Sequence, residues 1–278
     1  MTKTWLITGA NRGLGRVFAT AALKRGDKVA ATSRTLSALD DLVADYGDLV
    51  VPLQLDVTDR SACFAVVQEA AARLGRIDIV VNNAGYGLFG MVEEISEQQM
   101  RDQMEVNFFG LVNMTQAVLP LLRGQASGHI IQISTIGGVM AFPGLGAYHA
   151  SKWAVEGLTD ALAQEVAGFG IKVSLVEPGP YMTDWAGNSA SHATQIAAYD
   201  DLRNAVRHGQ SQMPPAVFGE PEATGPAILK LVDADNPPLR FFLGLLPTML
   251  VPDAYQARLA SWEEWKDVSV AATKISQD

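Results

Sequence analysis

The sequence predicts one α/β domain in three layers, with a doubly wound parallel sheet between two layers of helices. Short β-branched runs alternate with amphipathic segments through the first two thirds of the chain, which is typical of strand–helix–strand crossovers. Glycine directly follows several amphipathic segments, as it often follows helices. The run at 77–81 is apolar throughout, as in a strand covered on both faces. In such sheets ligands bind beyond the carboxyl ends of the strands.

The first part of the pattern begins with the β-branched strand Thr4–Thr8 and the helix Leu14–Arg25, which Gly26 ends. The following strands are expected at Lys28–Ser33, Val50–Leu55 and Ile77–Val81, and the helices between them at Ser37–Tyr46 (before Gly47) and Arg60–Leu74 (between the N-cap Asp59 and Gly75).

The second part has longer helices. A single helix is expected over Glu97–Leu122, with Ser96 as its N-cap and Gly110 tolerated inside it. The strand Ile130–Ile133, the helix Ala147–Ala167 and the strand Lys172–Val176 follow.

The alternation stops after Pro178. Residues 180–220 are rich in Gly, Ser, His and Pro, and they predict a lid over the substrate. A helix near Pro221–Val232, a strand near Leu239–Gly244 and a tail helix near Asp253–Lys266 complete the chain. With 278 residues, the chain fits one domain over 1–278, with the lid at about 180–220 and a C-terminal extension at about 239–278.

Composition narrows the classes of protein. Hydrophobic residues make up 48% and charged residues 18% of the chain, as in a globular protein. The net charge is −9, which disfavours binding to nucleic acid. Cys63 is the only cysteine and no signal peptide precedes the first strand, so a cytoplasmic location is expected.

The longest apolar stretch, Phe241–Val251, is interrupted by Pro247 and is too short to span a bilayer. It predicts a buried strand followed by a surface loop. No membrane association is expected.

The first strand leads into a glycine-rich turn with the spacing G-x-x-x-G-x-G, formed by Gly9, Gly13 and Gly15. Glycine is needed where the backbone approaches a pyrophosphate, and the helix that follows points its free N–H groups at that phosphate. The turn therefore predicts a Rossmann-like dinucleotide site, with Asn11, Arg12 and Leu14 in the same loop. A glycine-rich turn without a ligand is the alternative.

The end of the second strand discriminates between NAD and NADP. An acidic residue there would bind the ribose of NAD, but this chain has Ser33 followed by Arg34. Arg12 and Arg34 can converge on one phosphate, which favours NADP(H). Two arginines that merely face solvent are the alternative.

The next two strand ends complete the expected cofactor site. Asp56, with Val57 beside it, follows the third strand and is placed at the adenine. The run Asn82-Asn83-Ala84-Gly85 ends the fourth strand, and its small residues let the chain pass close to the adenosine ribose.

Of the six tyrosines, only Tyr148 has a lysine four residues later, Lys152. On a helix this spacing puts both side chains on one face. An ammonium lowers the pKa of a neighbouring phenol, so that Tyr148 can exchange a proton with a substrate oxygen. Ser134 and Thr135 follow the preceding strand and can hold that oxygen, and Asn107 can anchor a water that links Lys152 to solvent.

Together these motifs resemble the classical short-chain dehydrogenase/reductases over about the first 185 residues. The matching residues are Gly9, Gly13, Gly15, Asp56, Asn82–Gly85, Asn107, Ile133–Thr135, Tyr148, Lys152, Pro178, Gly179 and Thr183. The resemblance implies a catalytic tetrad of Asn, Ser, Tyr and Lys. It also implies that Lys152 holds the nicotinamide ribose, and that the segment with Pro178, Gly179 and Thr183 touches the carboxamide. A dimer or tetramer is implied as well.

One position departs from the family. The serine of the family usually lies thirteen residues before the tyrosine, where this chain has Thr135, with Ser134 just before it. Threonine carries the same hydroxyl, so Thr135 is favoured for the role, and Ser134 remains the alternative.

The expected function is NADP(H)-dependent hydride transfer to or from a carbonyl or secondary alcohol. Large apolar residues in the lid predict an apolar or aromatic substrate; they are Met182, Trp185, Tyr199, Met213 and Phe218. The alternative is that these residues form a dimer interface or pack on the core. A cofactor-binding sensor without turnover and an epimerase or dehydratase of the extended branch are the alternatives. The four histidines show no metal-ligand spacing, so no metal is expected.

Overall fold

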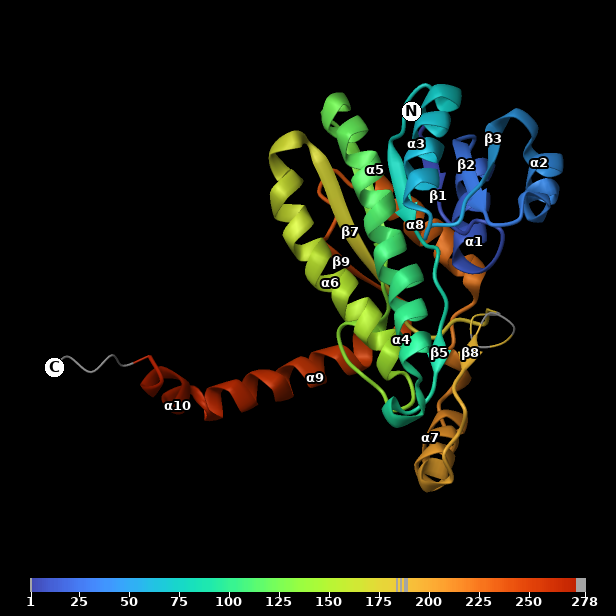
Figure 1. Ribbon diagram of the computed structural model, residues 1–278. Coiled ribbons are helices and arrows are strands. Elements are labelled where there is room, and N and C mark those ends of the chain that lie inside the picture. Colours follow the sequence, from blue (N-terminus) through green and yellow to red (C-terminus); the bar gives the residue numbers. More distant parts are fainter. Residues whose placement is uncertain (1, 184, 186, 188–189, 274–278) are drawn as a thin grey trace.

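A seven-stranded parallel sheet forms the centre of the protein, as the sequence predicts (Figure 1). The computed structural model describes residues 2–183, 185, 187 and 190–273. The strand order is β3-β2-β1-β4-β6-β7-β9. The strands are β1 (Thr4–Ile7), β2 (Lys28–Ser33), β3 (Val50–Gln54), β4 (Ile79–Asn82), β6 (Gly128–Ile133), β7 (Ile171–Pro178) and β9 (Arg240–Leu243). A separate two-stranded sheet pairs β5 (Leu88–Phe89) with β8 (Ser191–His192).

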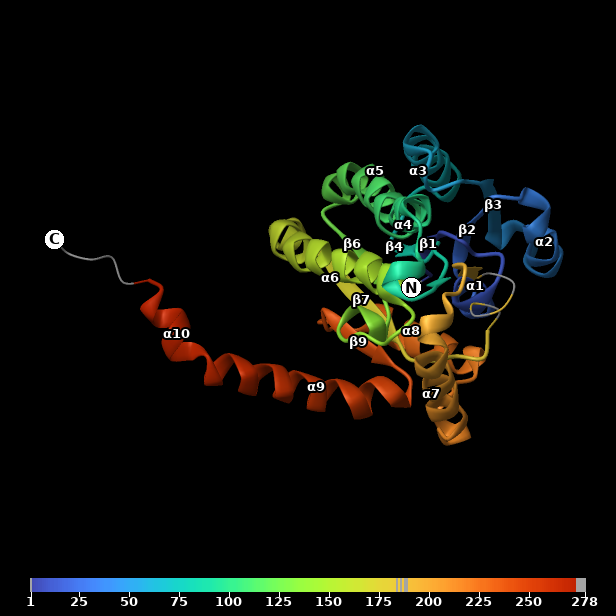
Figure 2. The ribbon, with the colours of Figure 1, turned by 60° about the horizontal axis from the view of Figure 1, so that its bottom comes forward.

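Helices cover both faces of the sheet, which gives the predicted three layers (Figure 2). The layer of α3 (Arg60–Leu74), α5 (Gly110–Gln125) and α6 (Gly146–Val166) packs on one face. The other face carries α1 (Gly13–Lys24), α2 (Asp40–Tyr46) and α8 (Thr224–Asp233). Strand side chains alternate between the two layers, since Leu6 packs in the first and Ile7 in the second.

Strand order reverses beside β1, whose neighbours are β2 and β4. This reversal separates the crossover connections and opens a crevice at the carboxyl ends of the strands. The loops that follow β1, β2, β4 and β6 all leave the sheet at this edge, so the candidate residues in them are brought together.

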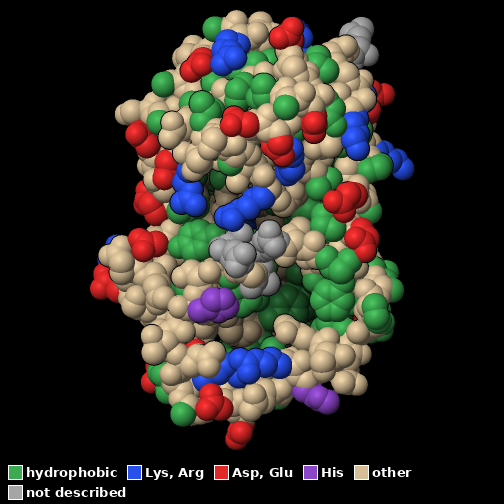
Figure 3. Space-filling view, turned by 90° about the vertical axis from the view of Figure 1, so that its right-hand side faces the viewer, with side chains coloured by type: hydrophobic (Ala, Val, Ile, Leu, Met, Phe, Trp, Pro, Cys, Tyr) green, Lys and Arg blue, Asp and Glu red, His purple; other side chains and the backbone are tan. Residues whose placement is uncertain are grey.

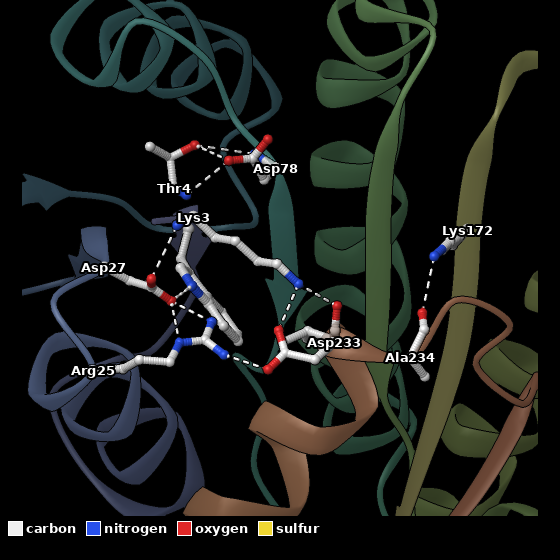
Figure 4. Close-up of polar contacts among 10 residues, drawn as sticks. Lys3, Thr4, Arg25, Asp27, Asp78, Lys172, Asp233 and Ala234 are labelled. Atoms are coloured by element: carbon white, nitrogen blue, oxygen red, sulfur yellow. Dashed lines mark hydrogen bonds and ion pairs between the residues drawn. The ribbon is translucent and has the colours of Figure 1, made fainter. Parts of the chain in front are cut away.

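The opposite edge is closed by a buried polar cluster around Asp27 (Figure 4). Its carboxylate accepts hydrogen bonds from the Lys3 backbone N–H at 3.0 Å, the Trp5 indole at 2.8 Å and the Arg25 Nε at 3.0 Å. Arg25 also pairs with Asp233 at 2.8 Å, at the end of α8. The cluster therefore fastens α8 to β1 and α1 at the edge away from the crevice.

The predicted helix Glu97–Leu122 is divided in the structure. It consists of α4 (Glu97–Met104), a π-helical turn over Glu105–Phe109, and α5. Such turns are rare and are frequent at functional sites, and this one carries Asn107. Gly110 is required by packing, because a Cβ there would lie 2.5 Å from a methyl carbon of Val57.

The prediction of a surface loop after strand β9 is wrong. Helix α9 (Leu245–Glu264) begins directly after β9, and its first turns pack on the loop after β6. Pro247 is accepted because it lies in the first turn, where backbone N–H groups have no helical partner. The remainder of α9 and α10 (Lys266–Ala271) extends away from the sheet (Figures 1 and 2).

The segment at 180–220 contains more regular structure than predicted. Besides β8, it holds α7 (Asp200–Ser211), a helix that lies beside the small β5–β8 sheet. Within the described part of the chain, no helix is long and apolar enough to cross a membrane.

Candidate active site

The turn after β1 is held in shape by two glycines and an asparagine. Gly9 has φ of +64°, a left-handed conformation that glycine adopts easily. A Cβ on Gly15 would lie 2.4 Å from Asn83 Nδ2 and 2.5 Å from the Gly9 carbonyl. Asn83 Nδ2 donates to the carbonyls of Thr8 at 2.9 Å and Gly9 at 3.1 Å. The side chain of Asn83 therefore clasps the glycine turn instead of pointing at a ligand.

Thr8 extends this clasp and was not singled out from the sequence. Its Oγ1 accepts hydrogen bonds from the backbone N–H groups of Asn83 at 2.9 Å and Ala84 at 3.0 Å. Its place directly before the first glycine is the signal that sequence reasoning could have used.

The start of α1 fits a phosphate group. Arg12 is the N-cap residue in an extended conformation, and no side chain caps the helix. A Cβ on Gly13 would meet nothing within 4 Å, so the backbone there borders open space. Unpaired N–H groups and the positive end of the helix dipole attract anions. Leu14 packs into the core beside this turn, and Asn11 is half-buried.

Two exposed arginines lie at the adenosine end of the expected site. Arg34 follows the buried Ser33, and its carbonyl accepts a hydrogen bond from Gln54 Nε2 at 3.0 Å. Neither Arg12 nor Arg34 forms an ion pair with any residue that the structure describes, whereas the nearby Arg16 pairs with an acidic residue of α2 at 2.7 Å. Both guanidinium groups are thus available for an anion.

Asp56 and Val57 lie after β3 with unequal exposure. Asp56 is exposed, and its Oδ1 accepts from the N–H of Thr58 at 3.0 Å and its hydroxyl at 2.8 Å, which leaves Oδ2 as the oxygen for another donor. Val57 is buried against Gly110, and its carbonyl accepts from Asn113 Nδ2 at 3.1 Å. Val57 can therefore contact a ligand only through a small part of its surface.

Tyr148 and Lys152 are both buried on the same face of α6. Lys152 Nζ donates to the Ile133 carbonyl at 2.8 Å and lies 5.9 Å from the centre of the Tyr148 ring. Burial lowers the pKa of Lys152 to about 8. Burial also raises the pKa of Tyr148, while a hydrogen bond with Thr135 acts in the opposite direction.

The two candidate hydroxyls face different surroundings. Thr135 Oγ1 donates to the Pro178 carbonyl at 3.3 Å, and Thr135 is the side chain that acts to lower the pKa of Tyr148 against the effect of burial. Ser134 Oγ is buried with no hydrogen-bond partner among the described residues, and a Cβ on Gly138 would lie 2.4 Å from it. Thr135 is therefore the hydroxyl beside the phenol.

Asn107 is 1% exposed, so it is not an amide on a helix surface. Its Oδ1 accepts from the Tyr86 N–H at 3.0 Å, and its Nδ2 donates to the Tyr86 carbonyl at 2.9 Å and to Ser151 Oγ at 3.2 Å. A Cβ on Gly85 would lie 3.0 Å from Asn107 Oδ1 and 3.8 Å from Lys152 Nζ. Asn107 thus fixes the chain after β4 close to the lysine.

The segment after β7 closes the site on the other side. Gly179 N–H donates to the Leu243 carbonyl at 2.8 Å, and a Cβ on Gly179 would press on Pro247 at 2.8 Å. Thr183 N–H donates to the Tyr181 carbonyl at 2.8 Å, so this segment makes a tight turn as it enters the lid.

Among the large apolar residues predicted in the lid, Trp185 packs on Tyr148. The Trp185 ring lies 4.9 Å from the Tyr148 ring and 5.3 Å from that of Phe89, measured between centroids. Met182 and Phe218 are exposed, and the Tyr199 hydroxyl donates to Glu93 at 2.6 Å. Phe89 was missed from the sequence, since a two-residue strand gives no periodic signal. No group of His, Cys, Asp and Glu in the described residues could hold a metal ion.

Comparison with known proteins agrees with this geometry. A family model described as short chain dehydrogenase matches residues 3–194. "Oxidoreductase BOA17" of Botryotinia fuckeliana is 41% identical over 98% of this chain and 100% of its own length. A "3-ketodihydrosphingosine reductase" of Bacteroides thetaiotaomicron is 40% identical over 92% of this chain and 91% of its own.

Solved structures give the same relationship. A short-chain dehydrogenase from Streptomyces avermitilis superposes with a TM-score of 0.90 at 39% identity, covering 99% of this chain and 100% of its own. "ElxO with NADP Bound" superposes with a TM-score of 0.73 at 27% identity, covering 87% of this chain and 97% of its own.

Proposed function

The chain belongs to the short-chain dehydrogenase family, and we propose that it is an NADP(H)-dependent oxidoreductase acting on a carbonyl or secondary alcohol. The observation that carries the proposal is the meeting of Thr135, Tyr148 and Lys152 at the same sheet edge as the glycine turn. A proton donor, a fixed cation and a nucleotide cradle are then within one crevice.

Each catalytic side chain has a defined task. Nicotinamide, when bound, supplies or accepts the hydride. Tyr148 gives a proton to the substrate oxygen or takes one from it, and the Thr135 hydroxyl orients that oxygen. Lys152 stabilises the negative charge on the phenol as the proton leaves. Asn107 acts by positioning, because its amide holds the backbone of Tyr86 and the hydroxyl of Ser151.

Carbonyl reduction is the favoured direction. Burial keeps the Tyr148 pKa above its ordinary value, so the phenol is protonated near neutral pH, and a protonated phenol is the form that reduction consumes. A relative at 40% identity is named 3-ketodihydrosphingosine reductase, and a reductase acts in this direction.

NADP(H) is the proposed cofactor. Gly9, Gly13 and Gly15 shape the pyrophosphate cradle, and the backbone from Asn11 to Leu14 borders it. Arg12 and Arg34 are free to hold a 2′-phosphate, and the end of β2 has no carboxylate that would repel it. Asp56, Ala84 and Gly85 border the adenosine, and Lys152, Pro178, Gly179 and Thr183 border the nicotinamide. The solved structure of ElxO, at 27% identity, has NADP bound.

The substrate is proposed to be apolar or aromatic. Trp185 covers Tyr148, and Phe89 continues the same aromatic surface. Aromatic side chains gathered over a reacting group favour apolar ligands. The lid that carries Trp185 would open to admit such a compound.

A homo-oligomer is also proposed. Trp262 and Trp265 are 64% and 61% exposed on the arm formed by α9 and α10, which extends from the body. Isolated helices are marginal in water, so such an arm needs a covering surface. The body exposes Phe109 and Phe169, and a two-fold pairing of two copies would cover both arms at once.

The function is tested by NADPH oxidation with a panel of apolar ketones and aldehydes. We expect turnover with wild-type protein and none with Tyr148→Phe. Tight NADPH binding without oxidation of any carbonyl would indicate a cofactor-binding sensor instead. Interconversion of sugar epimers without net NADPH consumption would indicate the extended branch.

A further inference from the structure

A cavity of about 240 Å³ lies between the β5–β8 sheet, the loop before α6 and helix α7. Most of its wall is apolar, and the wall includes Phe89, Met91, Pro143, Leu145 and Val206. Tyr148 is not among the lining residues, so the cavity is a space beyond the catalytic group. Figure 3 shows this side of the molecule hollowed, with hydrophobic side chains inside the hollow and basic and His side chains near its edges.

Aromatic rings connect the catalytic tyrosine to this cavity. Tyr148 packs on Trp185 at 4.9 Å, Trp185 on Phe89 at 5.3 Å, and Phe89 on His192 at 5.2 Å between ring centroids. Phe89 and His192 both line the cavity. Packed rings therefore extend from Tyr148 to the wall of the cavity.

Two arginines of α7 line the far wall of the cavity, and they differ in their ion pairs. Arg203 is neutralised, because it binds the buried Glu94 at 2.5 Å and Asp200 at 2.7 Å. Arg207, one helical turn further along α7, is exposed and forms no ion pair with any described residue. Glu94 is the only acidic residue among the lining residues, and it already has Arg203 as its partner. Arg207 is thus the basic residue of the cavity wall that has no ion-pair partner among the described residues.

We propose that the cavity binds the far end of an elongated substrate, an apolar keto compound that ends in a carboxylate, with Arg207 as the partner of that carboxylate. The keto group lies at Tyr148, the apolar body follows Trp185 and Phe89, and the charged end reaches α7. This assignment rests on the proposed carbonyl reductase function and names its substrate class. Arg207 is a specificity-determining residue and takes no part in proton or hydride transfer.

The first experiment compares methyl ketones of short, medium and long alkyl chain, each ending in a carboxylate, with their methyl esters and with the matching primary amines. We expect kcat/KM for the acid to exceed that for the ester by about 5- to 10-fold. The preference should appear only above a threshold chain length, because a short chain cannot reach from Tyr148 to Arg207. The amines should be the poorest substrates.

Variants of Arg207 test whether this residue causes the preference for the acid over the ester. Arg207→Gln should bring the ratio of acid to ester close to one, without changing KM for NADPH. Arg207→Lys keeps the charge and should retain most of the preference. Arg101→Gln on α4, which removes an exposed arginine that pairs with Glu97 outside the cavity lining, is the matched control and should leave the ratio unchanged.

Calorimetry separates this inference from the proposed function. A fatty acid without the keto group cannot react, and it should bind wild-type protein about 5- to 10-fold more tightly than Arg207→Gln. Equal affinity for the two proteins would overturn the inference even if the enzyme reduces ketones. An absence of turnover with every ketone would overturn the proposed function, and with it the keto substrate, whereas the affinity for the fatty acid would still test Arg207 as the partner of a carboxylate. Turnover with equal kcat/KM for acid and ester at every chain length would overturn the inference alone.

Discussion

Lys152 Nζ donates a hydrogen bond to the backbone carbonyl of Ile133 at 2.8 Å, which fixes the ammonium 5.9 Å from the centre of the Tyr148 ring. The strand end thereby determines where the positive charge lies. Because the phenol and the ammonium are both buried, their interaction is weakly screened by water. The first prediction follows from the separate tasks of these two groups.

Tyr148→Phe should lower kcat by about 100- to 10,000-fold, the range for loss of a general acid, and leave the Kd for NADPH nearly unchanged. The substitution removes only the oxygen that serves the substrate. Lys152→Ala should weaken both activity and NADPH binding. Turnover and fluorescence titration of NADPH measure the two effects, and substantial turnover by Tyr148→Phe would rule out the mechanism.

Thr135→Val and Ser134→Ala distinguish the two hydroxyls. Thr135 acts to lower the pKa of Tyr148, whereas Ser134 Oγ faces Gly138. Thr135→Val should therefore lower kcat/KM by about 100-fold or more, as when a donor to the reacting oxygen is removed. Ser134→Ala should change kcat/KM by less than about 10-fold. The reverse ranking would assign the role to Ser134.

Arg34→Asp should reverse the cofactor preference. Wild-type protein should have a higher kcat/KM with NADPH than with NADH, and the variant should lose on the order of 1.5–3 kcal/mol with NADPH, towards the lower end because Arg34 is exposed. Arg16→Asp is not a suitable control, since Arg16 pairs with Asp41. Arg101→Gln is a suitable control, and it should leave the ratio of kcat/KM with NADPH to kcat/KM with NADH unchanged. A preference of wild-type protein for NADH would contradict the assignment.

The sequence predicted the sheet, and the places of the candidate residues at the ends of its strands, because both depend on local signals. Each of these signals spans only a few residues: an apolar run, the glycine spacing, or the interval from Tyr148 to Lys152. What was missed depends on packing between distant segments. The place of Trp185 on Tyr148 requires Gly87, since a Cβ there would lie 2.5 Å from the indole.

Helix α7 and the first turns of helix α9 were not predicted, for a different reason. In helix α7 only Leu202 and Val206 are large apolar residues. They lie four residues apart, as in an amphipathic helix, but the segment belongs to the stretch rich in Gly, Ser, His and Pro that was assigned to the lid as a whole. Helix α9 was predicted to begin at Asp253, after Pro247 and Pro252, because proline normally ends or precedes a helix. Packing of its first turns on the loop after β6 overrides that preference.

The arm of α9 and α10 supplies a prediction about assembly. Trp262→Glu combined with Trp265→Glu places charges on exposed positions, so the fold of each copy should be unchanged. We expect light scattering to give the mass of a monomer for the variant and of a dimer or tetramer for wild-type protein. Lys266→Glu, directly after Trp265 in the sequence, is a control for added negative charge that should keep the wild-type mass. A monomeric wild-type protein would contradict the proposal.

Lys152 links activity to pH. Burial lowers its pKa from 10.5 to about 8, so its charge is present below pH 8 and is lost as the pH rises through that value. Carbonyl reduction uses this charge to stabilise the phenol as the proton leaves. kcat/KM for reduction, measured from about pH 6 to about pH 10 in buffers of constant ionic strength, should therefore fall above about pH 8. A flat profile through pH 8 would contradict a role for the charge.

The same shift makes a prediction about stability with the opposite sign. Between pH 8 and about 10 the unfolded chain holds a proton on Lys152 that the folded chain has released, so the free energy of unfolding should rise with pH in this window through this residue. Above about pH 10 the raised pKa of Tyr148 works against the rise, because the unfolded chain then loses the phenolic proton first. Lys152→Met should abolish the rise between pH 8 and 10, and Lys24→Met on α1 should not. Urea unfolding of the three proteins at several pH values measures the difference, and parallel curves for wild type and Lys152→Met would show that the pKa of Lys152 is not lowered by burial.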